Sequence, residues 1–131
     1  MREILFRGKR FENGEWVYGC YVNQKNKHII FDKENEWHHY ISENELGQYT
    51  GLTDKNGKKI FEGDIIKDYS QLTNLIILWE NELCRWVRSE TLNTTDRLWY
   101  SINDIFLEDG CEVIGNIYDN PELLEGDDVK D

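Results

Sequence analysis

The chain has 131 residues, of which 13% are aromatic, and a formal net charge of −11. This length predicts one domain, or two small subdomains that share one core. A chain this long buries enough surface to fold without a stabilising metal ion or disulfide bond. The aromatic content excludes a disordered chain. Residues 101–131 carry 10 acidic side chains and 1 basic side chain, so the acidity is mostly C-terminal and argues against non-specific nucleic-acid binding.

The cysteine pattern and the N-terminal sequence predict a compartment. Three cysteines, at positions 20, 84 and 111, form no CxxC pair, which is typical of thiols kept reduced in a cytoplasm. The opening segment MREILFRGKRFENGEW has charges where a signal peptide needs an apolar core. The longest apolar run, residues 75–79, is too short to cross a bilayer. We therefore expect a cytoplasmic protein without membrane contact.

Period-two patterns in the first part of the chain predict short β-strands. Residues 16–22 alternate so that one face of a strand carries Trp16, Tyr18, Cys20 and Val22. Further strands are predicted over residues 4–6 and 27–31. Asn13-Gly14 tolerates the positive φ angles of a hairpin turn between the first two strands.

The pattern changes near residue 42. Ser42 followed three positions later by Glu45 fits a capping box, and Gly47 suits the end of a helix. One helical turn is therefore predicted over residues 42–47. We place a domain boundary here, with an N-terminal β subdomain over residues 1–46 and a C-terminal subdomain over residues 47–124.

The C-terminal subdomain is predicted to be rich in short strands, and the unbroken apolar run at 75–79 indicates a central strand buried on both faces. The predicted strands cover residues 58–61, 64–68, 75–80, 83–89, 97–100 and 112–118. Short helical segments are predicted between Ser101 and Gly110 and from Pro121, with Asn120 as the N-cap. Such spacing is typical of a small barrel or curled sheet. Residues 125–131 form an acidic tail that we expect to be disordered.

The stretch GQYTGLTDKNGKKIFEGDII, at residues 47–66, contains four glycines and poses the question of a ligand site. It has neither P-loop nor GxGxxG spacing, which argues against a phosphate cradle. A calcium loop with Asn56-Gly57 at its fifth and sixth positions would need carboxylates at Leu52 and Gly63. The residues fit turns better, because Asp54 can bond the amides that follow it and Gly63 lets the chain swing before a strand.

Five blocks resemble the YopX family, whose members are small proteins encoded mainly by bacteriophages and prophages. The blocks are GQYTGL at 47–52, DKNGKKIFEGDII at 54–66, GNIYDNPELL at 115–124, REILFRGKR at 2–10 and GEWVYG at 14–19. The resemblance implies a mainly β fold with short helices, in which short N-terminal strands precede a C-terminal SH3-like curled sheet or barrel. It implies no established activity and no catalytic, cofactor-binding or metal residue to carry over. It also implies the cytoplasm of a bacterial host. Residues 67–110 match no family feature.

Two local clusters are candidate partner contacts. In Trp37-His38-His39-Tyr40 the adjacent histidines of a strand point to opposite faces, so they are poorly placed to chelate one ion. Packing at a sheet edge and an exposed aromatic patch formed by Trp37, His38 and Tyr40 are the two interpretations. In the second cluster, Arg85, Trp86 and Arg88 form either a base-stacking surface or a strand with Trp86 in the core and arginines paired with carboxylates.

The sequence offers no nucleophile in a recognisable catalytic context, and we expect a non-enzymatic protein without a cofactor. The leading hypothesis is a phage accessory module that contacts a host or phage protein or copies of itself, since five tryptophans and many strand edges call for cover. The alternative is a nucleic-acid-binding or regulatory module that uses the Trp86 face of the C-terminal sheet.

Overall fold

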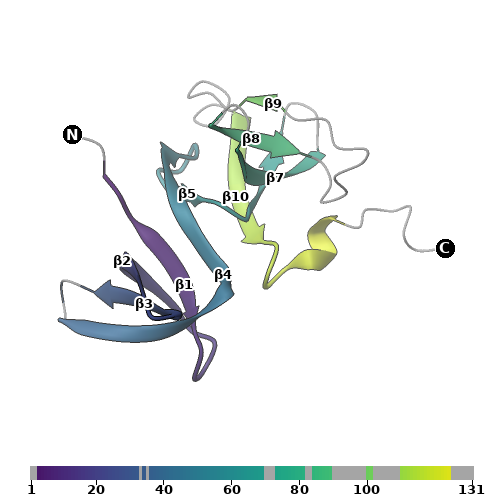
Figure 1. Ribbon diagram of the computed structural model, residues 1–131. Helices are drawn as coiled ribbons and strands as arrows, with labels where there is room; N and C mark the ends of the chain where they lie inside the picture. The colour runs from purple at the N-terminus through teal and green to yellow at the C-terminus, as the bar shows by residue number, and fades with distance from the viewer. Residues whose placement is uncertain are drawn as a thin grey trace. The chain divides into compact units, whose positions relative to one another are not determined.

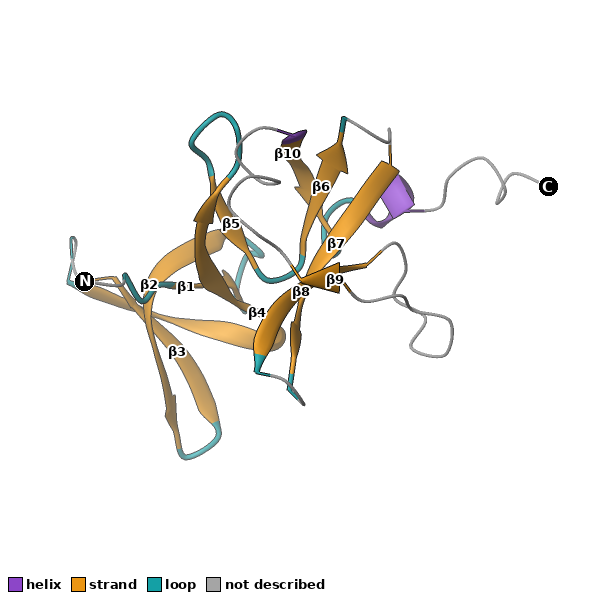
Figure 2. Ribbon diagram, turned by 90° about the horizontal axis from the view of Figure 1, so that it is seen from above, coloured by secondary structure: helices purple, strands orange, loops and turns teal. Residues whose placement is uncertain are grey.

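We describe the chain from a computed structural model, which describes residues 3–32, 34, 36–69, 73–81, 84–89, 100–101 and 110–124. The fold is mainly β, with ten strands and one short 3₁₀ helix among these residues (Figures 1 and 2). Contacts divide the chain into two compact units, Met1–Gly51 and Leu52–Asp131. All strand pairings with a resolved register are antiparallel. The SH3-like curl of the C-terminal sheet stays a prediction.

The first unit is built from β1 (Phe6–Arg10), β2 (Trp16–Gln24), β3 (Lys27–Asp32) and most of β4 (Trp37–Thr53). The predicted hairpin between β1 and β2 is confirmed, because the amides of Arg10 and Gly14 bond the carbonyls of Glu15 and Arg10 at 2.8 and 2.9 Å. β2 pairs first with β1 and then with β3, β3 pairs with the start of β4, and β4 returns to pair with β1. These four pairings close into a circuit around the buried side chains of Ile30 and Ile41.

The helical turn predicted over residues 42–47 is wrong, since this segment is part of the 17-residue strand β4. Gly8 pairs with Leu46 and Arg10 with Ile41, so two steps along β1 correspond to five along β4. Three extra residues of β4 therefore bulge at 42–45. The capping signal was local, whereas the pairing of β4 with β1 depends on residues more than thirty positions away, and this tertiary pairing determines the structure.

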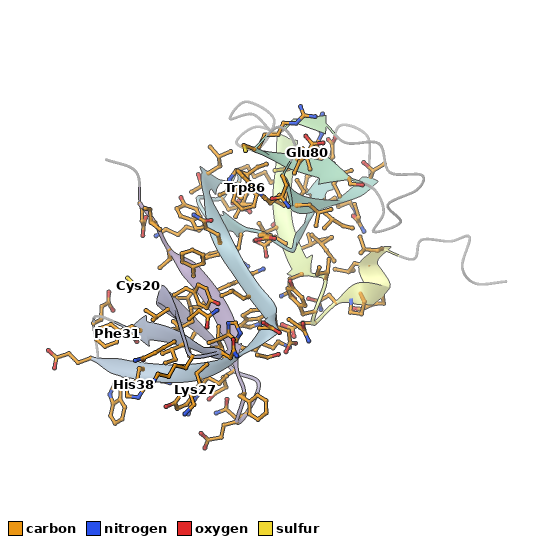
Figure 3. All side chains as sticks on the ribbon, viewed as in Figure 1. Cys20, Lys27, Phe31, His38, Glu80 and Trp86 are labelled. Atoms are coloured by element: carbon orange, nitrogen blue, oxygen red, sulfur yellow. The ribbon has the colours of Figure 1, made fainter. Side chains whose placement is uncertain are left out.

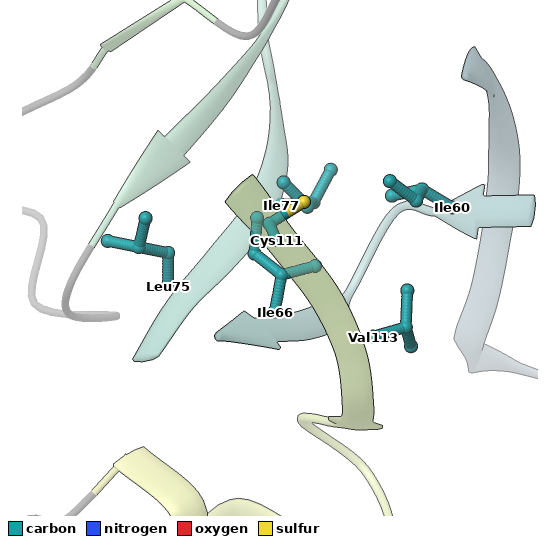
Figure 4. Close-up of a cluster of buried hydrophobic side chains, with 6 residues drawn as sticks. All are labelled: Ile60, Ile66, Leu75, Ile77, Cys111 and Val113. Carbon is teal, nitrogen blue, oxygen red and sulfur yellow. The ribbon is translucent and has the colours of Figure 1, made fainter. Parts of the chain in front are cut away.

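The second unit contains a five-stranded sheet in the order β10-β6-β7-β8-β9. Its strands are β6 (Asp64–Asp68), β7 (Thr73–Glu80), β8 (Arg85–Ser89), β9 (Tyr100–Ser101) and β10 (Cys111–Asn116), and β5 (Lys59–Phe61) precedes them. Leu75, Ile76 and Ile77 are consecutive and all buried, which confirms a central strand buried on both faces over residues 75–77. The predicted burial of the whole run 75–79 is wrong at its end, because Trp79 is 37% exposed. A cluster of buried apolar side chains joins β5, β6, β7 and β10 (Figure 4): Ile60, Ile66, Leu75, Ile77, Cys111 and Val113.

The turn interpretation of residues 54–64 is confirmed by the bonds of Asp54. This carboxylate is 3% exposed and accepts the amides of Asn56, Lys58 and Val113, each at 2.9 Å. It therefore ties its own turn to β10. The turn that follows is held by Asp64, which accepts the amide of Phe61 at 2.8 Å, and Gly63 has the positive φ of 90° that a side chain rarely adopts.

The remaining predictions of short elements have mixed outcomes. A helical turn does begin at Pro121, as the 3₁₀ helix η1 (Pro121–Leu124). The oxygen of the Asn120 side chain accepts the amide of Asn116 at 3.2 Å, so it fastens the turn backwards to β10. The predicted helix after Ser101, the strand segment 97–99 and the tail 125–131 lie outside the described residues.

Candidate functional site

The cluster Trp37-His38-His39-Tyr40 forms the start of β4, where it pairs with β3. Alternation along the strand separates its members. His38 and Tyr40 lie on one face, with their rings 6.0 Å apart in an edge contact, and Tyr40 is 52% exposed. Trp37 and His39 belong to the opposite face, together with the fully buried Ile30 of β3. The candidate residues Trp37 and Tyr40 therefore do not form one patch.

Tyr40 and His38 belong to a wider apolar surface. Residues directly opposite each other in the sheet share a face, and the register places Val22, Ile29 and Tyr40 in one row and Cys20, Phe31 and His38 in the next. Tyr18 lies two residues before Cys20 on β2 and is therefore on the same face. We call these seven residues the outer face, and Figure 3 labels three of them, Cys20, Phe31 and His38, on β2, β3 and β4. Tyr18, Val22 and Phe31 are 47%, 46% and 40% exposed.

A hollow of about 470 Å³ borders the outer face at Tyr40. Its lining includes Phe11, which is 80% exposed, and Ser42 and Glu43 of the β4 bulge. Lys27 also lines the hollow and holds its ammonium 5.9 Å from the centre of the Tyr40 ring, within the range of a cation–π contact. The bulge thus supplies polar groups beside an aromatic surface.

Three polar side chains form a hydrogen-bonded chain across the strands of the first unit. Nε2 of His28 lies 2.9 Å from a carboxylate oxygen of Glu43 on β4, and Nδ1 of the same ring lies 2.5 Å from the hydroxyl oxygen of Tyr21. The Tyr21 and His28 rings are parallel, with centroids 5.9 Å apart. These contacts join β2, β3 and β4, so the chain of bonds fixes the sheet that carries the outer face.

The second candidate cluster lies on β8 in the second unit. Trp86 packs against the buried cluster of that unit and meets Trp79 edge-on, with ring centroids 4.9 Å apart. Arg85 pairs with Glu80, its cross-strand neighbour on β7, with 2.5 Å between Nε and Oε1, and Figure 3 labels Trp86 and Glu80. Arg88 lies opposite Ile77 on the same strand pair. Trp86 and Arg85 thus match the interpretation in which the tryptophan packs in the core and the arginine pairs with a carboxylate.

Three observations concern the ionisable side chains of the described residues. No group of three or more His, Cys, Asp or Glu side chains within this part of the chain is arranged to hold a metal ion. The thiol of Cys111 is an inert core group, because burial raises its pKa to about 12. Tyr69 donates its hydroxyl to Glu112 at 2.5 Å, and this bond raises the pKa of the phenol.

Sequence reasoning found His38 and Tyr40 but missed Phe31 and Val22. A signal for both was present, because residues 16–22 and 29–31 are apolar on both alternating faces. An antiparallel sheet that is covered on one side normally alternates apolar with polar residues. The register that brings Phe31 beside His38 is set by how the chain connects β3 to β4, and it could not be read from the individual strands.

Comparison with protein families identifies the chain. A family model described as YopX protein matches residues 5–125, nearly the whole sequence. The chain belongs to the YopX family. This YopX-family chain is also similar to the crystal structure of protein EF1440 from Enterococcus faecalis, at 24% sequence identity and a TM-score of 0.50, over 95% of this chain and 100% of that one. The likeness concerns the fold alone.

One further comparison and one structural observation concern this YopX-family chain. None of the curated proteins compared with it matches. Within the described residues, no helix has the length and apolar character needed to span a membrane.

Proposed function

We propose that this YopX-family chain is a non-enzymatic accessory protein of a phage or prophage, which works in the cytoplasm of a bacterial host by contact with protein. The contact surface is the outer face of β2, β3 and β4. The observation that carries the proposal is the exposure of Tyr18, Phe31 and Tyr40 on one side of a sheet whose other side already holds the buried Ile30.

The composition of the outer face supports protein as the partner. Tyrosine and phenylalanine are enriched in protein interfaces, and acidic residues are depleted from interface cores. The chain has 26 acidic residues, yet none of the seven positions of the outer face is acidic. An apolar sheet surface of this kind binds by excluding water, which requires neither cofactor nor nucleophile.

Site-specific photocrosslinking in the native host cell tests the proposal. A benzophenone side chain replaces His38, which is exposed on the outer face, and a matched variant carries it at Asn23, which is exposed on β2 at a position of the opposite face. We expect discrete protein adducts from position 38 that position 23 does not give. Equal labelling from both positions, or no adduct from position 38, would refute the proposal.

A further inference from the structure

We propose that the hollow beside Tyr40 anchors an arginine side chain of the partner protein. The proposal rests on the proposed function, since it names the chemistry by which the border of the outer face selects its partner. The hollow, of about 470 Å³, is formed by an aromatic pair and by the β4 bulge. It lies within the first unit, because all of its lining residues fall between positions 11 and 44.

The aromatic side of the hollow consists of Phe11 and Tyr40. The amide of Phe11 donates to the carbonyl of Tyr40 at 2.9 Å, which places the two residues side by side. Their side chains are 80% and 52% exposed, so each leaves a large surface for a partner. A planar guanidinium stacks on aromatic faces, and arginine is one of the residues enriched at interface hot spots.

The Tyr40 ring already contacts a cation. Lys27 holds its ammonium 5.9 Å from the centre of this ring, within the distance of a cation–π contact. Lys27 is exposed at the start of β3 (Figure 3), and its flexible four-carbon stem lets the ammonium leave the hollow. The ammonium therefore marks the position that a cation of the partner takes when it replaces Lys27 at the ring.

The bulge supplies the acceptor that a guanidinium needs. Glu43 lines the hollow with a side chain that is 65% exposed, and its Oε2 lies 2.9 Å from Nε2 of His28. Its Oε1 makes no hydrogen bond or ion pair within the described part of the chain. Arginine has five N–H donors and no acceptor, so it suits a lining in which Ser42 and Asn44 carry further oxygens. The bond to the carboxylate is charge-assisted and is the strongest of these.

Charge complementarity favours a cationic anchor over an anionic one. Lys27 and Glu43 carry opposite charges in the lining, where His28 contacts Glu43, so the field of the whole chain decides the sign. The chain has 15 basic and 26 acidic side chains, and this net charge of −11 attracts a basic partner and repels an acidic one. Salt screens this attraction, so binding should weaken as salt is added.

NMR titration of the isotope-labelled full chain with blocked peptides tests the proposal. The probe is acetyl-Gly-Arg-Gly-amide. In the matched probes the arginine is replaced by citrulline, which keeps its shape without the charge, or by glutamate. We expect millimolar binding of the arginine probe, as suits a small ligand, with shifts at the amides of Phe11, Tyr40 and Glu43. This binding should weaken with salt, and neither matched probe should bind.

Three variants locate the contact. Glu43→Gln should weaken binding of the arginine probe about tenfold, because it removes the charged acceptor. Lys27→Met should strengthen binding about threefold, because it frees the Tyr40 ring and removes a like charge. Glu15→Gln is the matched control and should bind like the wild type, since Glu15 is 69% exposed but is not part of the lining. The amide spectrum of each free variant should show that it is folded.

Three results would overturn the proposal. They are the absence of shifts with the arginine probe, equal binding of the citrulline probe, and equal weakening by Glu15→Gln and Glu43→Gln. The proposed function fails separately. If the arginine probe does not bind but position 38 gives protein adducts in cells, arginine is wrong as the anchor and the protein-contact role stands. If the probe binds as expected but position 38 gives no adduct, the arginine site stands and the outer face is wrong as the contact surface.

Discussion

The buried carboxylate of Asp54 makes a quantitative prediction about the stability of the second unit. Replacement by asparagine keeps one oxygen for the amides of Asn56 and Lys58 but turns an N–H₂ group toward the amide of Val113. A hydrogen bond to a charged group contributes about 1.5–3 kcal/mol, and a buried N–H without an acceptor costs about 1–3 kcal/mol. We therefore expect Asp54→Asn to lower the free energy of unfolding by about 2–4 kcal/mol.

Replacement by alanine should cost more, because all three amides lose the carboxylate. The expected loss is about 4–6 kcal/mol, which is a large fraction of the 5–15 kcal/mol that stabilises an ordinary domain. The assay is urea unfolding followed by tryptophan fluorescence, with the free energy extrapolated to water. Asp32→Asn is the control, since Asp32 also bonds the amide two residues ahead, at 3.0 Å, but is less buried. A loss below about 0.5 kcal/mol for Asp54→Asn, equal to the control, would refute the reasoning.

Three further predictions concern the second unit. Gly63→Ala should lower the melting temperature, with a cost of about 1–3 kcal/mol in stability, because Gly63 has a φ of +90° and the added carbon would lie 3.0 Å from the Tyr118 ring. Gly110→Ala is the control and should leave the melting temperature unchanged, because no described atom lies within 4 Å of the added carbon. The pKa of Cys111 is about 12 in the folded chain and 9 in the unfolded chain, so only the unfolded chain loses this proton between pH 9 and 12. The free energy of unfolding of the wild type should therefore fall over this range by up to about 1.4 kcal/mol per pH unit more than that of Cys111→Val. Parallel curves for the two proteins would contradict this. Trp86→Ala should lower the free energy of unfolding in urea by about 3 kcal/mol, because Trp86 packs against the buried cluster. It should leave the salt-dependent retention of the protein on oligonucleotides unchanged. A change in retention at unchanged stability would support the base-stacking interpretation instead.

Local sequence signals predicted the strands and turns of the second unit well. The alternation and turn residues around Asp54 and Gly63 identified the two turns, and the unbroken run at Leu75 identified the central strand. Each of these features is set by neighbours in the sequence, such as an amide two residues ahead or a glycine at positive φ. The role of Asp54 in holding β10 was not predictable, because Val113 lies 59 positions away.

Long-range pairing set the limits of prediction in the first unit. Ser42 and Glu45 satisfy a helix-capping rule, but they lie in a bulge that exists only because β4 pairs with β1. In the same way, Tyr40 was found as an aromatic residue of interest, whereas its row with Ile29 and Val22 required the registers of two strand pairs. Trp37 shows the converse error, since proximity in sequence suggested a shared surface that strand alternation divides.

The closed circuit of β1 to β4 has a consequence for the newly made polypeptide. Phe6 pairs with Gln48, which is translated 42 positions later, so at about 5–20 residues per second the first strand waits about 2–8 s for its second neighbour. During that interval its free backbone amides and carbonyls can join a strand of another nascent chain. Ribosomes that follow one another closely on a message would bring such strands together, and misassembly should therefore depend on the rate of synthesis.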